Sequence, residues 1–172
     1  PPVSIRPEVS DQKYGLKSAS IKWEERRDNM KDVCMACHGE DWIDNFYIQY
    51  DALVHLYNEK YARPGLKLMN AAKPLLKPSK FSNKIDWTWF ELWHHEGRRA
   101  RHAAAMMGPD YTHWHGMYEV AERFYMQVIP QARELASHAA VDGDGTAARA
   151  VNEVIDEILS RPEHVWFEEG AE

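Results

Sequence analysis

Two cysteines and one histidine lie close enough together in this chain to act on a single chemical group. Cys34 and Cys37 are separated by two residues and His38 follows directly, which is the C-x-x-C-H pattern. In this pattern the two thiols bond to the vinyl groups of a porphyrin, while the adjacent imidazole binds its iron. We therefore predict one c-type haem, haem c, with His38 as the proximal iron ligand.

Other uses of the two thiols fit the sequence less well. These are the only cysteines in the chain, so a structural zinc site would lack a second pair of ligands. A thioredoxin-like redox pair is typical of a motif beside strands, whereas the sequence around this motif has a helical pattern. Two cysteines are also too few for a disulfide scaffold.

The second axial ligand of the iron has several candidates among the histidines. Adjacent residues on a helix point about 100° apart, so only one of His94 and His95 can face a given partner. We expect two faces, one with His95, Arg99 and His102, and one with His94, Arg98 and Arg101. Arg98 and Arg99 are candidates to bind haem propionates. His94, His95 and His115 are the candidate distal ligands, and a hydrogen-bonded or solvated side chain is the alternative for each of the histidines considered, which also include His55, His102, His113, His138 and His164.

Composition limits the partners of the chain. The 21 basic and 27 acidic residues give a net charge of −6, with no basic block, so we expect no nucleic-acid partner. No apolar run is long enough to cross a bilayer, so we expect no transmembrane segment. The first residues have neither the charged nor the apolar part of a signal peptide. We therefore expect a targeting segment to have been removed or to belong to a longer parent protein.

The spacing of apolar residues predicts an all-α fold of long helices packed side by side, without a sheet. We expect residues 1–17 to form an extended arm and residues 18–172 a helical haem-binding domain. Pro64 is expected to end the second helix, and Pro130 to kink or break the fifth. The expected helices span 18–36, 41–61, 66–76, about 85–107, from about 112 past 128, and 146–160.

One carboxylate interrupts an apolar helical stripe. Glu96 lies in register with apolar positions such as Leu92 and Ala100. A carboxylate that enters a core must be paired, and the arginines at 98–101 cannot easily turn back to it. We therefore expect its partner on another helix, either as a structural ion pair or as a group that fixes the tautomer of an imidazole.

Two segments resemble a known family. Residues 93–101 read WHHEGRRAR, and residues 106–116 read MMGPDYTHWHG. Both are similar to the C-terminal helical region of octahaem hydroxylamine oxidoreductases and hydrazine dehydrogenases. The last haem motif of those proteins is likewise followed by a segment like residues 57–64, YNEKYARP. The resemblance covers about residues 23–125.

The resemblance implies a homotrimer whose subunits each hold eight c-type haems, seven as electron carriers and one as the site of a small nitrogen substrate. In that family a tyrosine of a neighbouring subunit is bonded covalently to the catalytic haem, and Tyr111 is the matching position. It also implies a soluble electron acceptor such as a small cytochrome, and a location in the periplasm or the internal compartment of anammox bacteria, the anammoxosome lumen. This chain has one haem motif, so the catalytic haem would lie on the remainder of the enzyme.

We therefore expect the haem c electron-transfer part of a multihaem hydroxylamine or hydrazine oxidoreductase, either as a fragment or as a separate subunit. An iron with two imidazole ligands has no site for substrate, which suits electron transport. Three alternatives remain: a stand-alone monohaem c-type cytochrome, a haem sensor with an open iron site, and a purely structural helical module.

Overall fold

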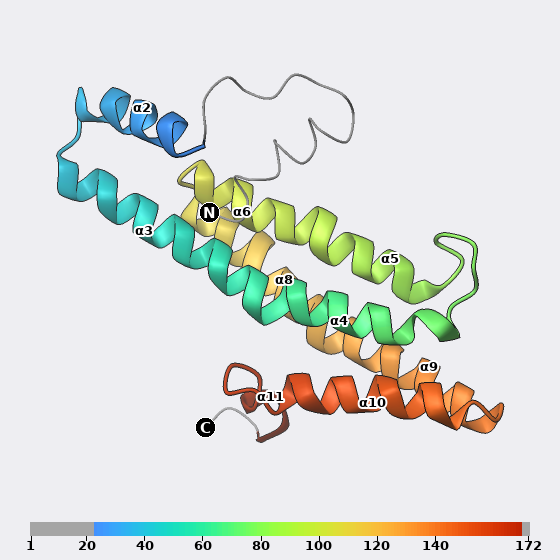
Figure 1. Cartoon of the computed structure of the whole chain (residues 1–172). Coiled ribbons are helices and arrows are strands. Elements are labelled where there is room, and N and C mark those ends of the chain that lie inside the picture. Colours follow the sequence, from blue (N-terminus) through green and yellow to red (C-terminus); the bar gives the residue numbers. More distant parts are fainter. Residues whose placement is uncertain (1–22, 170–172) are drawn as a thin grey trace. The chain divides into compact units, whose positions relative to one another are not determined.

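The structure is a computed structural model that describes residues 23–169 (Figure 1). Over these residues the chain forms helices joined by turns and contains no strand, which confirms the predicted all-α class. The predicted arm over residues 1–17 and the first residues of the first predicted helix lie outside the described residues. No helix in the described range combines the length and the apolar character that spanning a bilayer requires.

Contacts divide the chain into two compact units, with the boundary after His55. The first unit contains α2 (Trp23–Met35) and most of α3 (Glu40–Tyr57). The predicted helices over 18–36 and 41–61 correspond to these two elements. The C-x-x-C-H motif begins in the last turn of α2, as the sequence pattern indicated, and its last residue lies just before α3.

The second unit contains the remaining helices, several of which include π-helical stretches with a wider turn. The first group is η1 (Asn58–Ala62, π), α4 (Arg63–Ala72) and the short 3₁₀ helix η2 (Lys73–Leu75). The second is α5 (Lys84–Phe90), η3 (Glu91–Glu96, π) and α6 (Gly97–Ala105). The third is α7 (Pro109–Thr112), η4 (His113–Tyr118, π), α8 (Glu119–Arg123), η5 (Phe124–Val128, π) and α9 (Ile129–Val141). The last two helices are α10 (Gly145–Leu159) and α11 (Trp166–Glu169).

Two prolines that were expected to interrupt helices lie inside continuous helical segments. Pro64 is the second residue of α4 and Pro130 the second residue of α9, and each follows a π-helical stretch directly. In an α-helix a proline removes one hydrogen bond and its ring clashes with the carbonyl four residues back. Just before both prolines, Arg63 and Ile129 instead donate their N–H groups to carbonyls five residues back. We infer that this wider turn accommodates the proline ring, so the predicted stop and break are wrong.

The core of the second unit lies between these helical segments. Phe124 and Val128 from the third group and Ile155 from α10 are fully buried, with no measurable exposure. The helix α10 packs on α9 and α4, and Asp144 caps its first turn by accepting a hydrogen bond from the Ala147 N–H at 3.1 Å. The predicted apolar stripe of this helix is therefore confirmed.

Two glycines allow the helices around the candidate site to approach closely. A Cβ on Gly116 of η4 would lie 2.7 Å from the Cα atom of Ala100 in α6. A Cβ on Gly97 would lie 2.3 Å from the Tyr57 hydroxyl. The first approach brings η4 against α6, and the second brings α6 against the last residue of α3.

Candidate functional site

Ion pairs fix the hairpin that carries the cysteine motif. Arg27 of α2 donates two hydrogen bonds to the Asp51 carboxylate of α3, at 2.7 and 2.8 Å, and its guanidinium lies 4.6 Å from the centre of the Tyr47 ring. Lys31 and Asp44 form a second ion pair at 2.5 Å. The hydrogen bonds from Arg27 lower the pKa of Asp51, so the first pair stays charged at neutral pH. Two ion pairs thus join the helix before the turn to the helix after it.

The turn itself brings the three motif side chains close together. The carbonyl of Cys34 accepts hydrogen bonds from the N–H of Cys37 at 3.1 Å and from the N–H of His38 at 3.0 Å. Residues three and four apart in such a helical turn share one face. Both cysteines are free thiols, with Cys34 half-buried and Cys37 exposed. The turn therefore presents two free thiols and one imidazole within five consecutive residues.

The side chains on and around this turn are of the kinds that a c-type haem requires. His38 is exposed and its ring stacks on Trp42, with centroids 4.0 Å apart. The stack uses the face of the imidazole, whereas iron would bind a nitrogen at its edge. Val33 and Met35 expose 69% and 48% of their surface beside the thiols, so apolar surface is available for a flat cofactor to cover. Thiols, imidazole and exposed apolar surface fit covalent haem attachment.

Side chains alone offer no metal site in the part of the chain that the structure describes. Among the described residues, no group of three or more His, Cys, Asp or Glu side chains is arranged to hold a metal ion. A haem differs because the porphyrin supplies four ligands, which leaves at most two for the protein.

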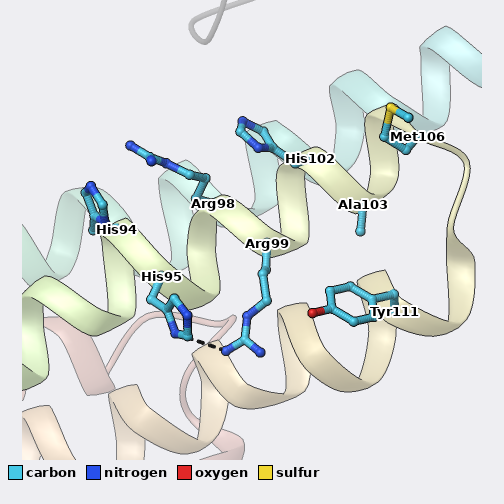
Figure 2. A pocket seen from close by; sticks show the side chains of 8 residues that line it. All are labelled: His94, His95, Arg98, Arg99, His102, Ala103, Met106 and Tyr111. Atoms are coloured by element: carbon cyan, nitrogen blue, oxygen red, sulfur yellow. Dashed lines mark hydrogen bonds between the residues drawn. The ribbon is translucent and has the colours of Figure 1, made fainter.

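A second candidate region lies between α6 and α7. A hollow of about 330 Å³ is bordered by eight side chains, which include five basic or imidazole groups on η3 and α6 and the ring of Tyr111 (Figure 2). Tyr111 is 48% exposed, and in Figure 2 its hydroxyl is directed toward Arg99. Its ring lies 5.0 Å from that of His115. The phenol expected to reach a partner's haem is therefore on an accessible surface. The full lining is His94, His95, Arg98, Arg99, His102, Ala103, Met106 and Tyr111.

The predicted faces of this helix need one correction. Figure 2 shows His94 and Arg98 on one side and His95 and Arg99 on the other, so the two adjacent histidines do point apart as expected. His102, however, lies with Arg98 rather than with Arg99. His102 is four residues from Arg98 and three from Arg99. Both spacings make helical neighbours, so spacing alone does not decide which arginine His102 lies beside.

Arg101, which was expected on the face of His94 and Arg98, contacts a core residue. Its guanidinium lies 4.5 Å from the centre of the buried Tyr57 ring. This cation–π contact places Arg101 against the core of the second unit.

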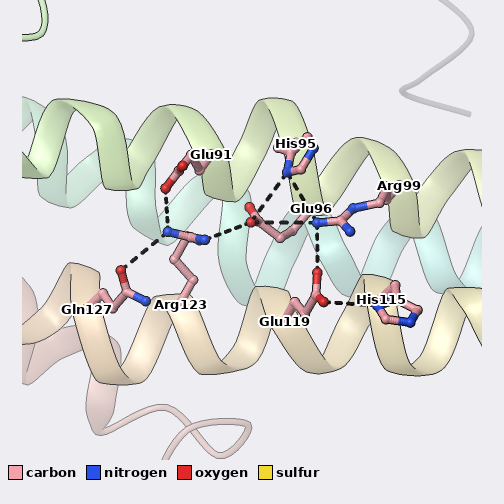
Figure 3. Close-up of polar contacts among 8 residues, drawn as sticks. All are labelled: Glu91, His95, Glu96, Arg99, His115, Glu119, Arg123 and Gln127. Atoms are coloured by element: carbon pink, nitrogen blue, oxygen red, sulfur yellow. Dashed lines mark hydrogen bonds and ion pairs between the residues drawn. The ribbon is translucent and has the colours of Figure 1, made fainter.

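Glu96 has the partner that the sequence predicted, on another helix. Only 2% of Glu96 is exposed, and its Oε1 atom accepts a hydrogen bond from Arg123 of α8 at 2.9 Å (Figure 3). Arg99 and His95 lie farther from the same oxygen, at 3.9 and 3.7 Å. The other oxygen of this carboxylate, Oε2, is buried without a hydrogen-bond partner. The interrupted stripe thus marks an ion pair between η3 and α8.

Further charged groups extend this ion pair into a network. Arg123 also binds Glu91, and Arg99 binds Glu119 at 2.8 Å. Glu119 in turn lies 3.1 Å from the Nδ1 atom of His115 (Figure 3). Arg99 is therefore held by carboxylates, whereas Arg98 projects on the side opposite this network in Figure 2. Of the two arginines expected to bind propionates, Arg98 is the better placed.

Replacing Glu96 with glutamine should destabilise the second unit by about 1–3 kcal/mol, because it removes the charge of the more deeply buried of the two carboxylates that pair with the Arg123 guanidinium. The urea midpoint of Glu96→Gln, followed by circular dichroism, measures the effect. Glu157→Gln is the matched control, since Glu157 forms exposed ion pairs with Lys67 and Arg161 and its loss should change the midpoint much less. Equal midpoints for wild type and Glu96→Gln would contradict the assigned role of Glu96.

The candidate distal ligands occupy different settings. His94 stacks on Phe90 with centroids 4.4 Å apart, while His95 contacts Arg99 at 3.2 Å. His115 contacts Glu119, as described above. His38 belongs to the first unit and these three histidines to the second. Of the other histidines considered, His55, His102, His113 and His138 are exposed, and His164 is fully buried.

The sequence did not identify several residues of these networks. Glu91 and Glu119 were not singled out, and neither was Arg123, although Glu119 and Arg123 are four residues apart on one helix and thus readable as a charged face. The hydrogen bond between Tyr125 and His164 was also missed. No local pattern links two residues so far apart in the chain.

No protein-family model matches the chain, and no curated protein or solved structure matches it. The relation to hydroxylamine oxidoreductases thus stays a prediction from the two motif segments.

Proposed function

We propose that the chain carries one covalently attached c-type haem and serves as an electron-transfer part of a multihaem oxidoreductase acting on hydroxylamine or hydrazine. One observation carries the haem proposal: Cys34, Cys37 and His38 lie on a single turn, with both thiols free and two N–H groups bound to one carbonyl. The oxidoreductase class rests on the resemblance of residues 93–101 and 106–116 to that family.

Each residue of the turn would have a defined task. The sulfurs of Cys34 and Cys37 would form the two thioether bonds, and a ring nitrogen of His38 would bind the iron from the same side. The bidentate pair of Arg27 and Asp51 would hold the turn in place when the cofactor binds. When bound, the haem supplies one-electron chemistry at a six-coordinate iron.

The surface around Tyr111 supports the proposal that the chain is part of a multihaem oxidoreductase. Tyr111 is exposed and borders the 330 Å³ hollow, which Arg98 and three imidazoles also line. A tyrosine that bonds to the catalytic haem of a neighbouring subunit needs an accessible phenol, and the guanidinium of Arg98 would bind a propionate of that haem. The substrate reaction itself would occur on the partner's haem.

The proposal implies partners for this chain. They are the remainder of a multihaem subunit, neighbouring subunits in a homotrimer-like assembly, and a soluble electron acceptor such as a small cytochrome. The compartment would be the periplasm or the anammoxosome lumen, where c-type haem is attached under oxidising conditions.

Spectroscopy of the haem-loaded full chain distinguishes electron transfer from ligand sensing. The chain is matured in a host that attaches c-type haem and is then reduced with dithionite. We expect a low-spin spectrum that carbon monoxide leaves unchanged, because two side-chain ligands occupy the iron. A high-spin spectrum that shifts with carbon monoxide would contradict the electron-transfer role and favour the sensor.

The oligomeric form distinguishes an enzyme part from a stand-alone cytochrome. Native material run under denaturing conditions should show this chain bonded to a larger haem-staining polypeptide, and Tyr111→Phe should abolish the bond. Tyr118→Phe is the matched control, because Tyr118 is also exposed and lies two helical turns away. A chain that migrates alone in the wild type would contradict the cross-link and favour the carrier.

A further inference from the structure

A third group of titratable side chains lies in the core, away from both candidate sites. Tyr61 of η1, Tyr125 of η5 and His164 before α11 are 5%, 3% and 0% exposed. The hydroxyl of Tyr125 lies 2.7 Å from Nδ1 of His164, and the ring of Tyr61 packs edge-on against that of Tyr125, with centres 6.2 Å apart. Three residues that are distant in the sequence thus lie against one another inside the protein.

The surroundings of Nε2 indicate which nitrogen of the His164 ring carries the hydrogen. His164 Nε2 is buried without a hydrogen bond of good geometry, and the Glu163 carboxylate and the backbone of Lys60 both favour the protonated form of the ring. A carbonyl has that effect by attracting an N–H. We infer that Nε2 carries the hydrogen, so Nδ1 accepts the hydrogen bond that the Tyr125 hydroxyl donates.

Tyr125 is therefore a proton donor whose hydrogen-bond partner, His164, is a neutral base. Burial lowers the pKa of His164 to about 4, with Lys60 and Arg161 adding to the effect and Glu163 opposing it, so the imidazole is neutral at pH 7. Burial also raises the pKa of Tyr125 above its ordinary value, so the phenol keeps its proton. A phenol that loses an electron becomes a strong acid. In a core, this loss is favourable only where a base can take the proton.

A path for electrons connects this pair with the surface. Trp166 is 42% exposed and its ring centre lies 5.0 Å from that of Tyr125. The Tyr61 ring lies 6.2 Å from Tyr125 on the inner side. Electron transfer between aromatic rings in contact is rapid, so an oxidant at the surface can reach the buried phenol through Trp166.

We propose that Tyr125 and His164 form a redox-active pair that receives oxidising equivalents through Trp166. Tyr125 loses one electron, which passes through Trp166 to a small one-electron-oxidising radical at the surface and reduces that radical. The proton of the Tyr125 hydroxyl moves to His164 Nδ1. The products are a neutral tyrosyl radical and an imidazolium. A thiol-class reductant returns one electron, and the proton then moves back to the phenol oxygen. This activity involves neither the cysteine motif nor Tyr111, so its failure would leave the haem proposal unchanged.

A flash-quench experiment on the full chain tests this pair. Photo-oxidised tris(bipyridine)ruthenium serves as the one-electron oxidant, with a cobalt(III) amine as the sacrificial acceptor. Electron paramagnetic resonance of frozen samples should show a neutral tyrosyl radical in the wild type. Tyr125→Phe should abolish this signal, whereas Tyr118→Phe, at a 55% exposed tyrosine, should retain it.

A second variant tests the role of the imidazole as the proton acceptor. His164→Gln keeps a hydrogen-bond acceptor but removes the base, so transient absorption should show radical formation about 100-fold slower, the lower range of what a positioned base contributes. Heavy water should slow the wild type more than this variant. Circular dichroism checks that each variant is folded, and if Tyr125→Phe is not, the His164→Gln rate decides. A wild type without a radical, a signal that survives in Tyr125→Phe, or an unchanged rate in His164→Gln would each overturn the proposal.

Discussion

Replacing Cys34 and Cys37 together with alanine is expected to remove all covalently held haem from the chain when it is matured without its partners. The thioether bonds are the only covalent links that the motif makes to the porphyrin, and these two residues are the only cysteines in the sequence. Each single variant keeps one thioether and should retain less haem than the wild type. Haem staining after a denaturing gel measures the covalent fraction directly.

Two further variants separate attachment from ligation and from general disruption of the turn. His38→Gln keeps both thiols, so haem that it retains should be covalently bound but should lose the low-spin spectrum. Met35→Leu changes an exposed residue inside the motif without removing a sulfur that binds haem, and it should stain like the wild type. Staining that persists in the double cysteine variant would show that the haem is attached elsewhere.

The second large effect is a loss of stability in mild acid that depends on His164. Its pKa is about 6.5 in an unfolded chain and is lowered to about 4 in the folded protein by burial. The unfolded state therefore binds more protons in this range, so stability falls as pH decreases. The expected loss is about 1.4 kcal/mol per pH unit below about 6.5, and about 3 kcal/mol in total near pH 4. Above pH 6.5 this contribution is fully retained.

Urea unfolding of wild type and His164→Gln at several pH values between 4 and 7 measures this effect. The variant should lose stability less steeply than the wild type, because the other titrating groups are common to both. His138→Gln, at an exposed histidine of α9, is the matched control and should keep the wild-type pH dependence. Parallel curves for wild type and His164→Gln would contradict the effect of His164 burial.

Local patterns in the sequence predicted much of the fold, but they did not predict how two prolines fit. Apolar spacing located the helices, including the stripe of α10 with Ile155 and Ile158 in the core. Pro64 and Pro130 were misjudged because the rule for proline assumes an α-helical turn before it. The π-helical stretches η1 and η5 change that turn, and the spacing of apolar residues does not reveal them.

The candidate sites likewise differ in how far local sequence predicts them. The cysteine turn is set by five consecutive residues, so its geometry follows from local sequence. Glu96 was predictable because a lone carboxylate in an apolar stripe requires a partner, although the sequence did not show that Arg123 would supply it. The pair of Tyr125 and His164 depends on the packing of η5 against the segment before α11, which spacing along the chain cannot indicate.

The intact mass of native material after denaturation tests the central claim most directly. Denaturation keeps thioether bonds and removes loosely held haem, so the account predicts this polypeptide with the added mass of one haem, and a haem-bearing peptide that contains Cys34 and Cys37. Where the chain is also joined to a larger multihaem polypeptide, the linking peptide should contain Tyr111. The mass of the bare polypeptide, with no haem-bearing peptide, would contradict the account.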